Sequence, residues 1–369
     1  MTEASPDVNG PSPTSPSRLL VVSLAGIGDT LMATPVLKEL RARFPAASVD
    51  VAVLWAGSEQ VLRHNPNVAT IHRHDFFAAT RIASLRFLFR LRRQRYDASL
   101  TLHPQGRRAY RVVTRMIGAR RRLSHRYENP SWIDALLVNE TVEQDYTVSC
   151  ATNNLRLVDR LGPGPRSSTT PAYELFLAPG EKDWATRCLS GLGLGGVRWL
   201  GIHVGSGGTK NLALRRWPES RWAELLARLR RARPDLRVVA LGGPGEVEAH
   251  RRLAASAPSV VFPEFPDIRH AAALLAHAHA FVSVDTAFMH LAAAVGVPRQ
   301  FVVETPTLNV PVEPLRSDWI RIPNPAVGGR PLDFYRYDGR SIAGTPDQIR
   351  RMMESVTADA VLAGLLPVL

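Results

Sequence analysis

The chain has 369 residues and a formal net charge of +13, with 45% hydrophobic and 21% charged residues. This length exceeds that of one hydrophobic core, so we expect two domains, and the composition excludes a chain that is disordered throughout. Two cysteines, Cys150 and Cys188, are too few for a disulfide framework or a four-cysteine zinc site, and they fit a cytoplasmic protein. The most apolar long stretch, 271–298, contains three histidines and Asp285, so we expect no membrane span.

The first predicted element is a buried parallel strand at Leu19–Leu24, which ends at Gly26 and Gly28 before a helical pattern. Ligands of open α/β sheets bind at the carboxyl ends of the strands, so Asp29 is expected at a functional edge. A dinucleotide fingerprint fails because Leu31 occupies its third glycine position. Two interpretations of Asp29 stay open, a catalytic acid and an N-cap of the following helix.

The next segments alternate between helical and strand patterns. Helices are predicted at 35–44, 59–64 and 81–95, and strands at 49–54, 68–72 and 98–102. This order is typical of a parallel sheet, and the strand 98–102 is followed at the same functional edge by Gly106, Arg107 and Arg108.

Positive charge is concentrated between Arg81 and Arg126, where fourteen arginines accompany one acid, Asp97. Such a field attracts an anionic glycolipid, another polyanion or an anionic membrane surface. Aromatic residues for stacking are sparse, so we do not expect nucleic acid as the partner. A solvated arginine-rich surface remains the alternative. Within this region the helix 81–95 is basic and amphipathic, with apolar residues on one side at Ile82, Leu85, Leu88 and Phe89.

A linker is predicted at 162–171, where Gly, Pro, Ser and Thr fill nearly every position. We expect a disordered tail over 1–17, an N-terminal acceptor-binding domain over 18–165 and a C-terminal nucleotide-sugar-binding domain over 166–345. The remaining residues, 346–369, are expected to form a C-terminal helix.

The second half repeats the α/β alternation. Strands are predicted at 199–204, 237–241 and 280–284, and helices at 219–231, 268–278 and 288–295. After the first strand, the glycine-rich loop 205–211 fails the phosphate-loop pattern. Its glycines still permit close approach to a phosphate, and Lys210, Arg215 and Arg216 supply cations nearby.

Asp285 follows the strand 280–284 and precedes a helix, a position suited to binding a pyrophosphate. The alternative is that Asp285 caps this helix and that His290 packs in its first turn. No two aspartates occur at D-x-D spacing, so no metal–diphosphate clamp is expected.

Five stretches, taken together and in this order, resemble glycosyltransferase family 9, the ADP-heptose:lipopolysaccharide heptosyltransferases. They are SLAGIGDTLMATPVLKELRARFP (23–45), QGRR (105–108), GIHVGSGGTKNLALRRWPESRWAEL (201–225), LGGPGE (241–246) and VSVDTAFMHLAAAVGVP (282–298). The resemblance implies an α/β, GT-B-like architecture of two Rossmann-like doubly wound domains facing a cleft. It also implies inverting transfer that needs no metal and no cofactor, from a nucleotide-sugar donor, ADP-heptose, to an anionic glycolipid such as lipopolysaccharide inner core, at the inner face of the cytoplasmic membrane.

Carried over by position, the resemblance assigns roles to individual residues. The catalytic aspartate is Asp29. The donor-binding residues are Arg215, Glu246, Asp285, Thr286 and His290, and we add Lys210 from the glycine-rich loop. On the acceptor side we expect Gly28, Arg107, Arg108 and Arg120.

The sequence also departs from the family pattern. Arg215 stands where lysine is common, Ala287 stands where glycine is usual, and Thr305 replaces part of a Gly-Pro-Thr turn. The segment 301–345 is unlike the family. These departures keep two alternatives open: a non-catalytic module that binds nucleotide-sugars or polyanions, and a family 9 transferase with another donor or acceptor. A nicotinamide oxidoreductase is disfavoured by the broken fingerprint.

Overall fold

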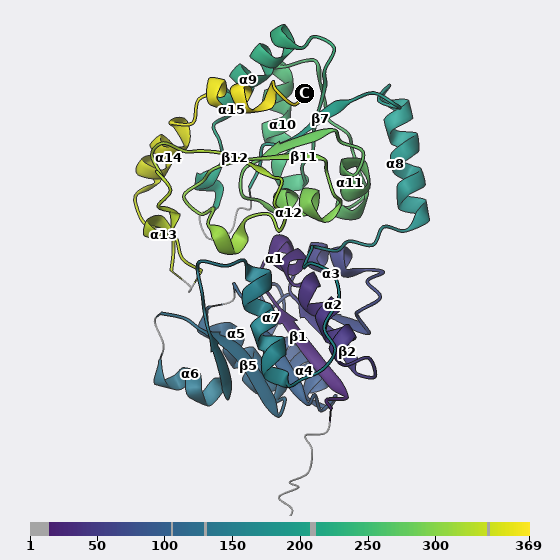
Figure 1. The fold of residues 1–369 in the computed structure, drawn as a ribbon, viewed down its shortest axis with the longest axis vertical. Coiled ribbons are helices and arrows are strands. Elements are labelled where there is room, and N and C mark those ends of the chain that lie inside the picture. The colour runs from purple at the N-terminus through teal and green to yellow at the C-terminus, as the bar shows by residue number, and fades with distance from the viewer. Residues whose placement is uncertain (1–14, 105, 129–130, 207–211, 338–339) are drawn as a thin grey trace, which may run out of the picture.

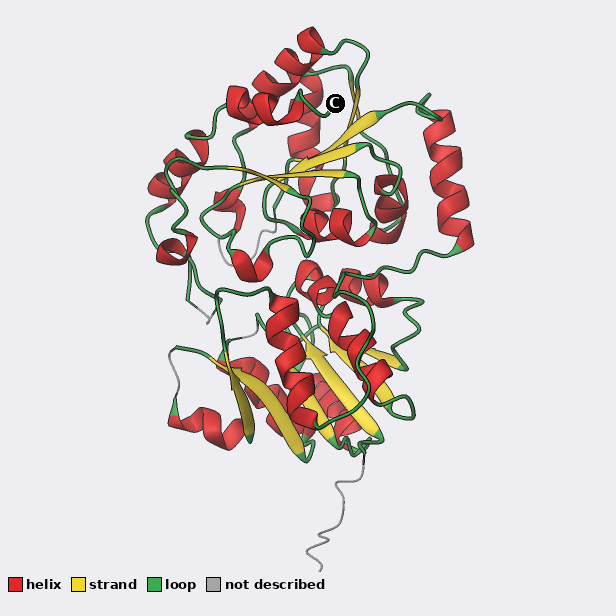
Figure 2. Ribbon diagram, in the orientation of Figure 1, coloured by secondary structure: helices red, strands yellow, loops and turns green. Residues whose placement is uncertain are grey.

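The computed structural model describes residues 15–104, 106–128, 131–206, 212–337 and 340–369. Its strands form two six-stranded sheets, and every strand pair is parallel. Figure 1 shows one sheet in each half of the molecule, surrounded by helices. Helices lie on both faces of each sheet (Figure 2). The predicted pair of Rossmann-like doubly wound domains is therefore confirmed.

The N-terminal sheet has the strand order β3-β2-β1-β4-β5-β6. Its strands are β1 (Arg18–Ser23), β2 (Ser48–Val53), β3 (Thr70–Arg73), β4 (Ala98–Thr101), β5 (Arg121–Arg126) and β6 (Glu140–Glu143). The accompanying helices are α1 (Ile27–Met32), α2 (Thr34–Arg43), α3 (Ala56–Leu62), α4 (Arg81–Arg92), α5 (Arg108–Ile117), α6 (Trp132–Leu137) and α7 (Cys150–Leu161). The order reverses between β1 and β4, so the loops after these two strands flank the topological switch point.

Alternate residues of β1 face two different helix layers. Leu19 and Val21 pack in a cluster with α2 and α7, whereas Leu20 and Val22 pack in a cluster with α4 and α5. All four side chains have no exposed surface. A continuous apolar run is the pattern expected of a strand that is buried on both faces, which is why this strand could be predicted.

The C-terminal sheet has the corresponding order β12-β11-β10-β7-β8-β9. Its strands are β7 (Trp199–His203), β8 (Arg237–Ala240), β9 (Val260–Val261), β10 (Ala280–Ser283), β11 (Arg299–Val303) and β12 (Ile320–Ile322). Its helices are α8 (Pro179–Gly191), α9 (Glu219–Ala232), α10 (Val247–Ser256), α11 (Ile268–Leu275), α12 (Ala287–Ala294), α13 (Pro331–Phe334), α14 (Pro346–Glu354) and α15 (Ala358–Leu365). Here the switch point lies between β7 and β10, and Asp285 follows β10, which corresponds to β4 of the first sheet. Asp29 and Asp285 therefore each follow a strand that flanks a switch point.

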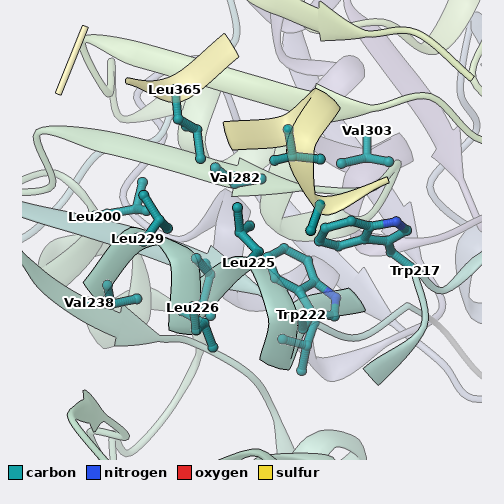
Figure 3. Close-up of a cluster of buried hydrophobic side chains, with 14 of the residues drawn as sticks. Leu200, Trp217, Trp222, Leu225, Leu226, Leu229, Val238, Val282, Val303 and Leu365 are labelled. Carbon is teal, nitrogen blue, oxygen red and sulfur yellow. The ribbon is translucent and has the colours of Figure 1, made fainter. Parts of the chain in front are cut away.

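One face of the C-terminal sheet is covered by a large apolar cluster that includes residues of α9 and α15 (Figure 3). Trp217 and Trp222 meet edge to face, with ring centroids 4.9 Å apart. The Trp217 indole also donates to the Val356 carbonyl oxygen at 2.9 Å. This bond ties the C-terminal segment to the loop that carries Arg215.

The two domains are in direct contact. Leu31 of α1 and Val61 of α3 belong to the same apolar cluster as Phe288 and Leu291 of α12. Arg269 of α11 is completely buried and donates to the carbonyl oxygens of residues 60 and 63, at the end of α3, at 2.9 and 3.1 Å. The same guanidinium forms a two-pronged ion pair with Glu181 of α8, at 2.5 and 2.8 Å. A buried charge with all these partners holds the second domain in a fixed orientation against α3.

Two sequence predictions differ from the structure near the chain ends. The segment 346–369 forms two helices, α14 and α15, because the Thr357 side chain accepts the Ala360 N–H at 3.2 Å and caps a new helix. Residues 1–14 of the expected tail lie outside the described residues, but Ser17 is held by Asp97, which accepts its backbone N–H at 2.8 Å. Within the described part of the chain, no helix is both long and apolar enough to cross a membrane.

Candidate active site between the domains

Asp29 lies in the loop and first helical turn that follow β1. Its Oδ2 accepts the Gly26 N–H at 2.5 Å, and Gly26 is the N-cap of α1. Asp29 is thus the third residue of the helix, and the interpretation of Asp29 as the N-cap itself is wrong. The hydrogen bond fixes the carboxylate at the carboxyl edge of the sheet, and the residue is only half-buried.

Gly28 brings this turn against the second domain. A Cβ at residue 28 would lie 2.5 Å from the imidazole Cδ2 of His290, which is too close for any other residue type without a shift of His290. Helices α1 and α12 are in contact along this seam. The structure therefore brings Gly28 of the predicted acceptor side, which precedes the predicted catalytic Asp29, against His290 of the predicted donor side.

A buried polar cluster lies at the carboxyl ends of β10 and β11. The Arg215 guanidinium donates to Asp285 Oδ2 at 2.8 Å and to the Thr307 hydroxyl at 3.0 Å. The Thr307 hydroxyl donates to the same Asp285 oxygen at 2.8 Å. Arg215 is 8% exposed and Asp285 4%, so the ion pair is largely shielded from water. This arrangement holds a guanidinium rigidly just before the first turn of α12.

Thr286 and His290 belong to the same turn. Thr286 is the N-cap of α12, and its hydroxyl accepts the Met289 N–H at 3.4 Å, so the interpretation of Asp285 as the helix cap is wrong. Burial lowers the pKa of His290 to about 4, and the Asp285 charge only partly opposes this effect. His290 is therefore a neutral imidazole at pH 7, and its buried Nδ1 has no hydrogen-bond partner among the described residues.

Glu246 lies in a short 3₁₀ turn after β8. Its Oε2 accepts the Gly243 N–H at 2.8 Å, and its other carboxylate oxygen is 3.8 Å from an Arg216 nitrogen. The carboxylate lies directly over Gly205, where a Cβ would have no room. An adjacent hollow at the ends of β8 and β9 is lined by backbone and apolar groups, including Gly242, Pro244, Val247, His250, Phe262 and Phe265.

On the acceptor side, a small cavity lies between the loop after β4 and a segment of the second domain. It is lined by Pro104, Gly106, Arg107, Tyr110, Tyr335 and Tyr337. Burial raises the pKa of Tyr110, and the negative charge of Asp29 raises it further. Burial also raises the pKa of Tyr335 to about 12, and the charges of Arg215, Asp29 and Asp285 all act on this phenol. The cavity is therefore close to both predicted halves of the site.

Two predicted residues, Arg120 and Arg108, lie apart from this arrangement. Arg120 donates to Asp97 at 2.8 Å, and Asp97 precedes β4, so Arg120 lies at the amino ends of the strands, opposite Asp29. Its assignment to the acceptor site is therefore corrected. Arg108 is exposed at the first residue of α5 and does not belong to the described lining of the cavity. Lys210 lies outside the described residues.

The structure adds residues that sequence reasoning missed. Thr307 completes the buried cluster, and the Tyr337 hydroxyl donates to the Thr307 carbonyl oxygen at 2.9 Å. Tyr335 meets Tyr337 edge to face, with ring centroids 4.8 Å apart. All three lie in the segment 301–345. The departure of this segment from the family pattern was the one sequence feature that pointed to it.

Comparison with known proteins identifies the chain. The model of glycosyltransferase family 9 (heptosyltransferase) matches residues 84–300. The chain belongs to glycosyltransferase family 9. This family 9 protein is therefore a glycosyltransferase, as the sequence predicted.

Relatives of this family 9 enzyme support the same assignment. It is 26% identical over 290 residues to lipopolysaccharide heptosyltransferase 3 of Escherichia coli, covering 73% of this chain and 78% of the relative. A family 9 glycosyltransferase of Veillonella parvula has a TM-score of 0.72 at 17% identity, covering 95% of this chain and 97% of that one. ADP-heptose lps heptosyltransferase II of E. coli has a TM-score of 0.68 at 21% identity, covering 95% and 98%. The GT-B-like architecture is thus confirmed.

The side chains that the structure describes do not gather into a metal site. Among the described residues there is no group of three or more His, Cys, Asp or Glu placed to hold a metal ion. Asp285, the acid of the donor turn, accepts hydrogen bonds from Arg215 and Thr307 through one carboxylate oxygen.

Proposed function

We propose that this family 9 enzyme transfers heptose from ADP-heptose to an anionic glycolipid such as lipopolysaccharide inner core. The observation that carries the proposal is the buried Arg215–Asp285–Thr307 cluster, which lies beside α12 while α12 itself packs against the turn that holds Asp29. Solved relatives include E. coli heptosyltransferase WaaC with ADP and with ADP-2-deoxy-2-fluoro heptose, each 19% identical to this chain. These names support ADP-heptose as the donor.

On the donor side, we assign the diphosphate to the start of α12. The positive end of the helix dipole and the Arg215 guanidinium both stabilise negative charge there. Asp285 and Thr307 orient the guanidinium, and His290 remains neutral because it is buried. The Glu246 carboxylate accepts hydrogen bonds from the ribose hydroxyls, and the neighbouring hollow binds the adenine base of the donor.

The reaction is a direct displacement. An acceptor hydroxyl oxygen bonds to the anomeric carbon of the heptose while the bond from that carbon to the diphosphate oxygen breaks, and ADP leaves. Asp29 takes the proton of the attacking hydroxyl as general base. Because the hydroxyl attacks the face opposite the leaving group, the anomeric configuration inverts. Arg215 and the start of α12 stabilise the charge that builds on the diphosphate, so we propose that no metal is required.

On the acceptor side, we assign the anionic glycolipid to the cavity beside Arg107 and Tyr110. Its charge is complementary to Arg107, and Arg108 follows at the start of α5. A lipid-linked acceptor places the reaction at a membrane surface, and the arginine-rich N-terminal domain is suited to the inner face of the cytoplasmic membrane.

The test begins with donor binding. A panel of ADP-, GDP- and UDP-linked sugars is screened by thermal shift, because a ligand that binds only the native state raises the midpoint of unfolding. We expect ADP-heptose to give the largest shift. Transfer to lipopolysaccharide inner core is then followed by mass spectrometry with and without EDTA, and the anomeric configuration of the product is read by NMR. No shift with ADP-sugars, strong inhibition by EDTA reversed by a divalent ion, or retention of configuration would each contradict the corresponding part of the proposal.

A further inference from the structure

Large apolar side chains are exposed on one layer of the N-terminal domain. Among the described residues, eleven large hydrophobic side chains are exposed, and seven of them lie between residues 77 and 136: Phe77, Ile82, Leu85, Phe89, Val112, Trp132 and Leu136. Phe77, Trp132 and Ile82 are 79%, 78% and 63% exposed. A group of exposed apolar side chains of this kind usually marks an interaction surface, because it contributes nothing to the packing of the core.

These side chains belong to neighbouring helices. Helix α4 packs beside α5, and α5 beside α6, on the sheet face opposite α2 and α7. The inner side of α4 already buries Phe87, Leu88 and Leu91 in the core. The helix therefore has a second apolar side, and the sequence expectation that Leu88 shares a side with Ile82 and Phe89 is corrected. No described element covers this outer side, which we call the α4 face (Phe77, Ile82, Leu85 and Phe89 with the surrounding arginines).

Unpaired positive charge surrounds the α4 face. Six arginines in α4 and the following turn are exposed, and none has an ion pair with an acid of the described chain: Arg81, Arg86, Arg90, Arg92, Arg93 and Arg95. Several later arginines of the basic region form ion pairs inside the domain, whereas Arg107, Arg108 and Arg115 are also exposed. Examples are Arg111, paired with Asp134 at 2.9 Å, and Arg121, paired with Glu140 at 2.6 Å. Six of the fourteen arginines between 81 and 126 therefore lie exposed on α4 and the turn that follows it.

The α4 face also reaches the edge of the sheet where the reaction is proposed to occur. The Phe77 ring stacks on Trp55, with centroids 5.9 Å apart. Trp55 follows β2, and β2 pairs with β1, which is followed by Asp29. The carboxyl ends of parallel strands share one edge, so the face begins beside the active-site edge and extends down the domain along α4.

We propose that the α4 face docks on an anionic lipid bilayer, with Phe77, Ile82, Leu85 and Phe89 inserted at the interface and the α4 arginines on lipid phosphates. Apolar side chains flanked by arginines on one exposed helix surface are the chemistry that recognises such an interface. A symmetric contact with a second copy is disfavoured because it would place these arginines opposite one another. The inference rests on the proposed function in one respect, that the acceptor is lipid-linked and must reach the cavity beside Arg107.

The test uses the full chain and vesicles of defined composition. Sedimentation is measured with phosphatidylglycerol/phosphatidylcholine vesicles and with phosphatidylcholine alone. We expect binding to the anionic vesicles to exceed binding to neutral ones by at least tenfold and to weaken steeply as salt rises. Ile82→Ser/Phe89→Ser, and separately Arg86→Gln/Arg90→Gln, should each lower the binding to anionic vesicles by tenfold or more.

A matched control replaces two exposed apolar residues of the other domain, Val197→Ser/Leu366→Ser, and should bind vesicles as the wild type does. Circular dichroism confirms that each variant is folded. Equal binding by Ile82→Ser/Phe89→Ser and the wild type would overturn the proposal. So would equal binding to neutral and anionic vesicles. A concentration-dependent dimer that this variant abolishes, without vesicle binding by the wild type, would identify the face as a contact between copies instead.

A further measurement separates this inference from the proposed function. The thermal shift with ADP and transfer to a delipidated, soluble acceptor should be unchanged in Ile82→Ser/Phe89→Ser, while transfer to acceptor embedded in anionic vesicles should fall about tenfold, in line with vesicle binding. If the donor or acceptor assignment fails, the sedimentation result still decides the role of the α4 face. If vesicle binding is normal in the variant, the face has no such role, whatever the substrate.

Discussion

Gly28 of α1 packs directly against the His290 imidazole of α12, across the two halves of the candidate active site. The Cα hydrogen of Gly28 faces the imidazole so directly that a methyl group at residue 28 would lie 2.5 Å from Cδ2 of His290. Gly28 precedes the proposed base, and His290 lies one turn after the acid that orients Arg215. Because Asp29 and Arg215 belong to different domains, the packing of Gly28 on His290 sets the distance between the base and the leaving-group site.

Gly28→Ala is expected to separate α1 from α12 and so to lower turnover. Overpacking of a tight contact costs about 1–3 kcal/mol of stability. The matched control is Gly180→Ala in α8, where an added Cβ would meet nothing within 4 Å. In urea unfolding, the effects of Gly28→Ala and His290→Ala should be non-additive, because shortening His290 makes room for the methyl group. Additive effects of the two substitutions on the free energy of unfolding, or full activity of Gly28→Ala, would contradict a tight contact between Gly28 and His290.

Asp29→Asn should remove the general base while leaving the fold intact. The asparagine Oδ1 can still accept the Gly26 N–H, so the stability cost should be small. General base catalysis contributes about 10²–10⁴-fold, and kcat should fall by that order with donor affinity nearly unchanged.

The control for Asp29→Asn is Asp134→Asn in α6. Asp134 is also the third residue of a six-residue helix, and it accepts the Ser131 N–H at 3.0 Å in the same way. This variant removes a helix-start charge elsewhere in the domain and also the ion pair of Asp134 with Arg111, so it should lose some stability but keep its kcat where it is folded. A folded Asp29→Asn variant with full activity would show that Asp29 acts only in helix capping.

The sequence predicted the parts of the fold that carry regular signals. A continuous apolar run indicates a strand buried on both faces, and the turn residues that follow mark the functional edge, so Asp29 and Asp285 could be placed there. The prediction did not include α5, α7, α8, α10, β5, β9, β11 and β12. It also missed α6, α13 and the edge strand β6, which lack a buried apolar stripe; α6 and α13 bury no side chain completely.

The contacts of the site depend on tertiary structure and could not be predicted from local pattern. Arg215 and Asp285 are 70 residues apart in sequence, and Thr307 joins them from a third loop. The sequence left two roles for Asp29, a general base and an N-cap, because residue spacing alone does not show which residue begins a helix. The sequence could not show which arginines between 81 and 126 are ion-paired and which are exposed. Some of their partners are acids that lie outside this region, such as Asp134 and Glu140.

Acidic pH should destabilise the folded protein before the carboxylates titrate. Burial lowers the pKa of His125, His203 and His290 to about 4 each, whereas an unfolded histidine titrates near ~6.5. Between these values the unfolded chain binds more protons than the folded chain. The free energy of unfolding should therefore fall as pH drops from about 6.5 to about 4, with each histidine adding up to about 1.4 kcal/mol per pH unit.

Urea unfolding at pH 7.5, 6.0 and 5.0 measures this slope. His203→Gln should reduce the slope of the unfolding free energy against pH by the contribution of one buried histidine. His277→Gln, at an exposed position, should leave this slope unchanged. Stability that does not change between pH 7.5 and 5.0 would mean that the buried histidines are protonated in the folded state.

Arg215→Ala should affect both catalysis and stability, and a second substitution separates the two effects. The single variant leaves the Asp285 carboxylate buried with its ion-pair partner removed, which typically costs about 3–5 kcal/mol. Arg215→Ala/Asp285→Asn removes the buried charge as well, so its unfolding midpoint should return toward that of the wild type. Arg215→Lys keeps the positive charge but loses the planar fork, and we expect partial activity from it.

Catalysis should not recover with stability in the double variant. Arg215 is proposed to stabilise the leaving diphosphate, and loss of one such group typically lowers kcat by about 10²–10³-fold. The measurement is kcat at saturating donor for the wild type, Arg215→Lys and Arg215→Ala/Asp285→Asn, all at a temperature where each is folded. Arg350→Ala serves as the matched control, since Arg350 is an exposed arginine in an ion pair with Asp347 at 2.8 Å in α14. A double variant that is stable and turns over at the wild-type rate would restrict Arg215 to a structural role, because the charge on the departing ADP would then be stabilised elsewhere.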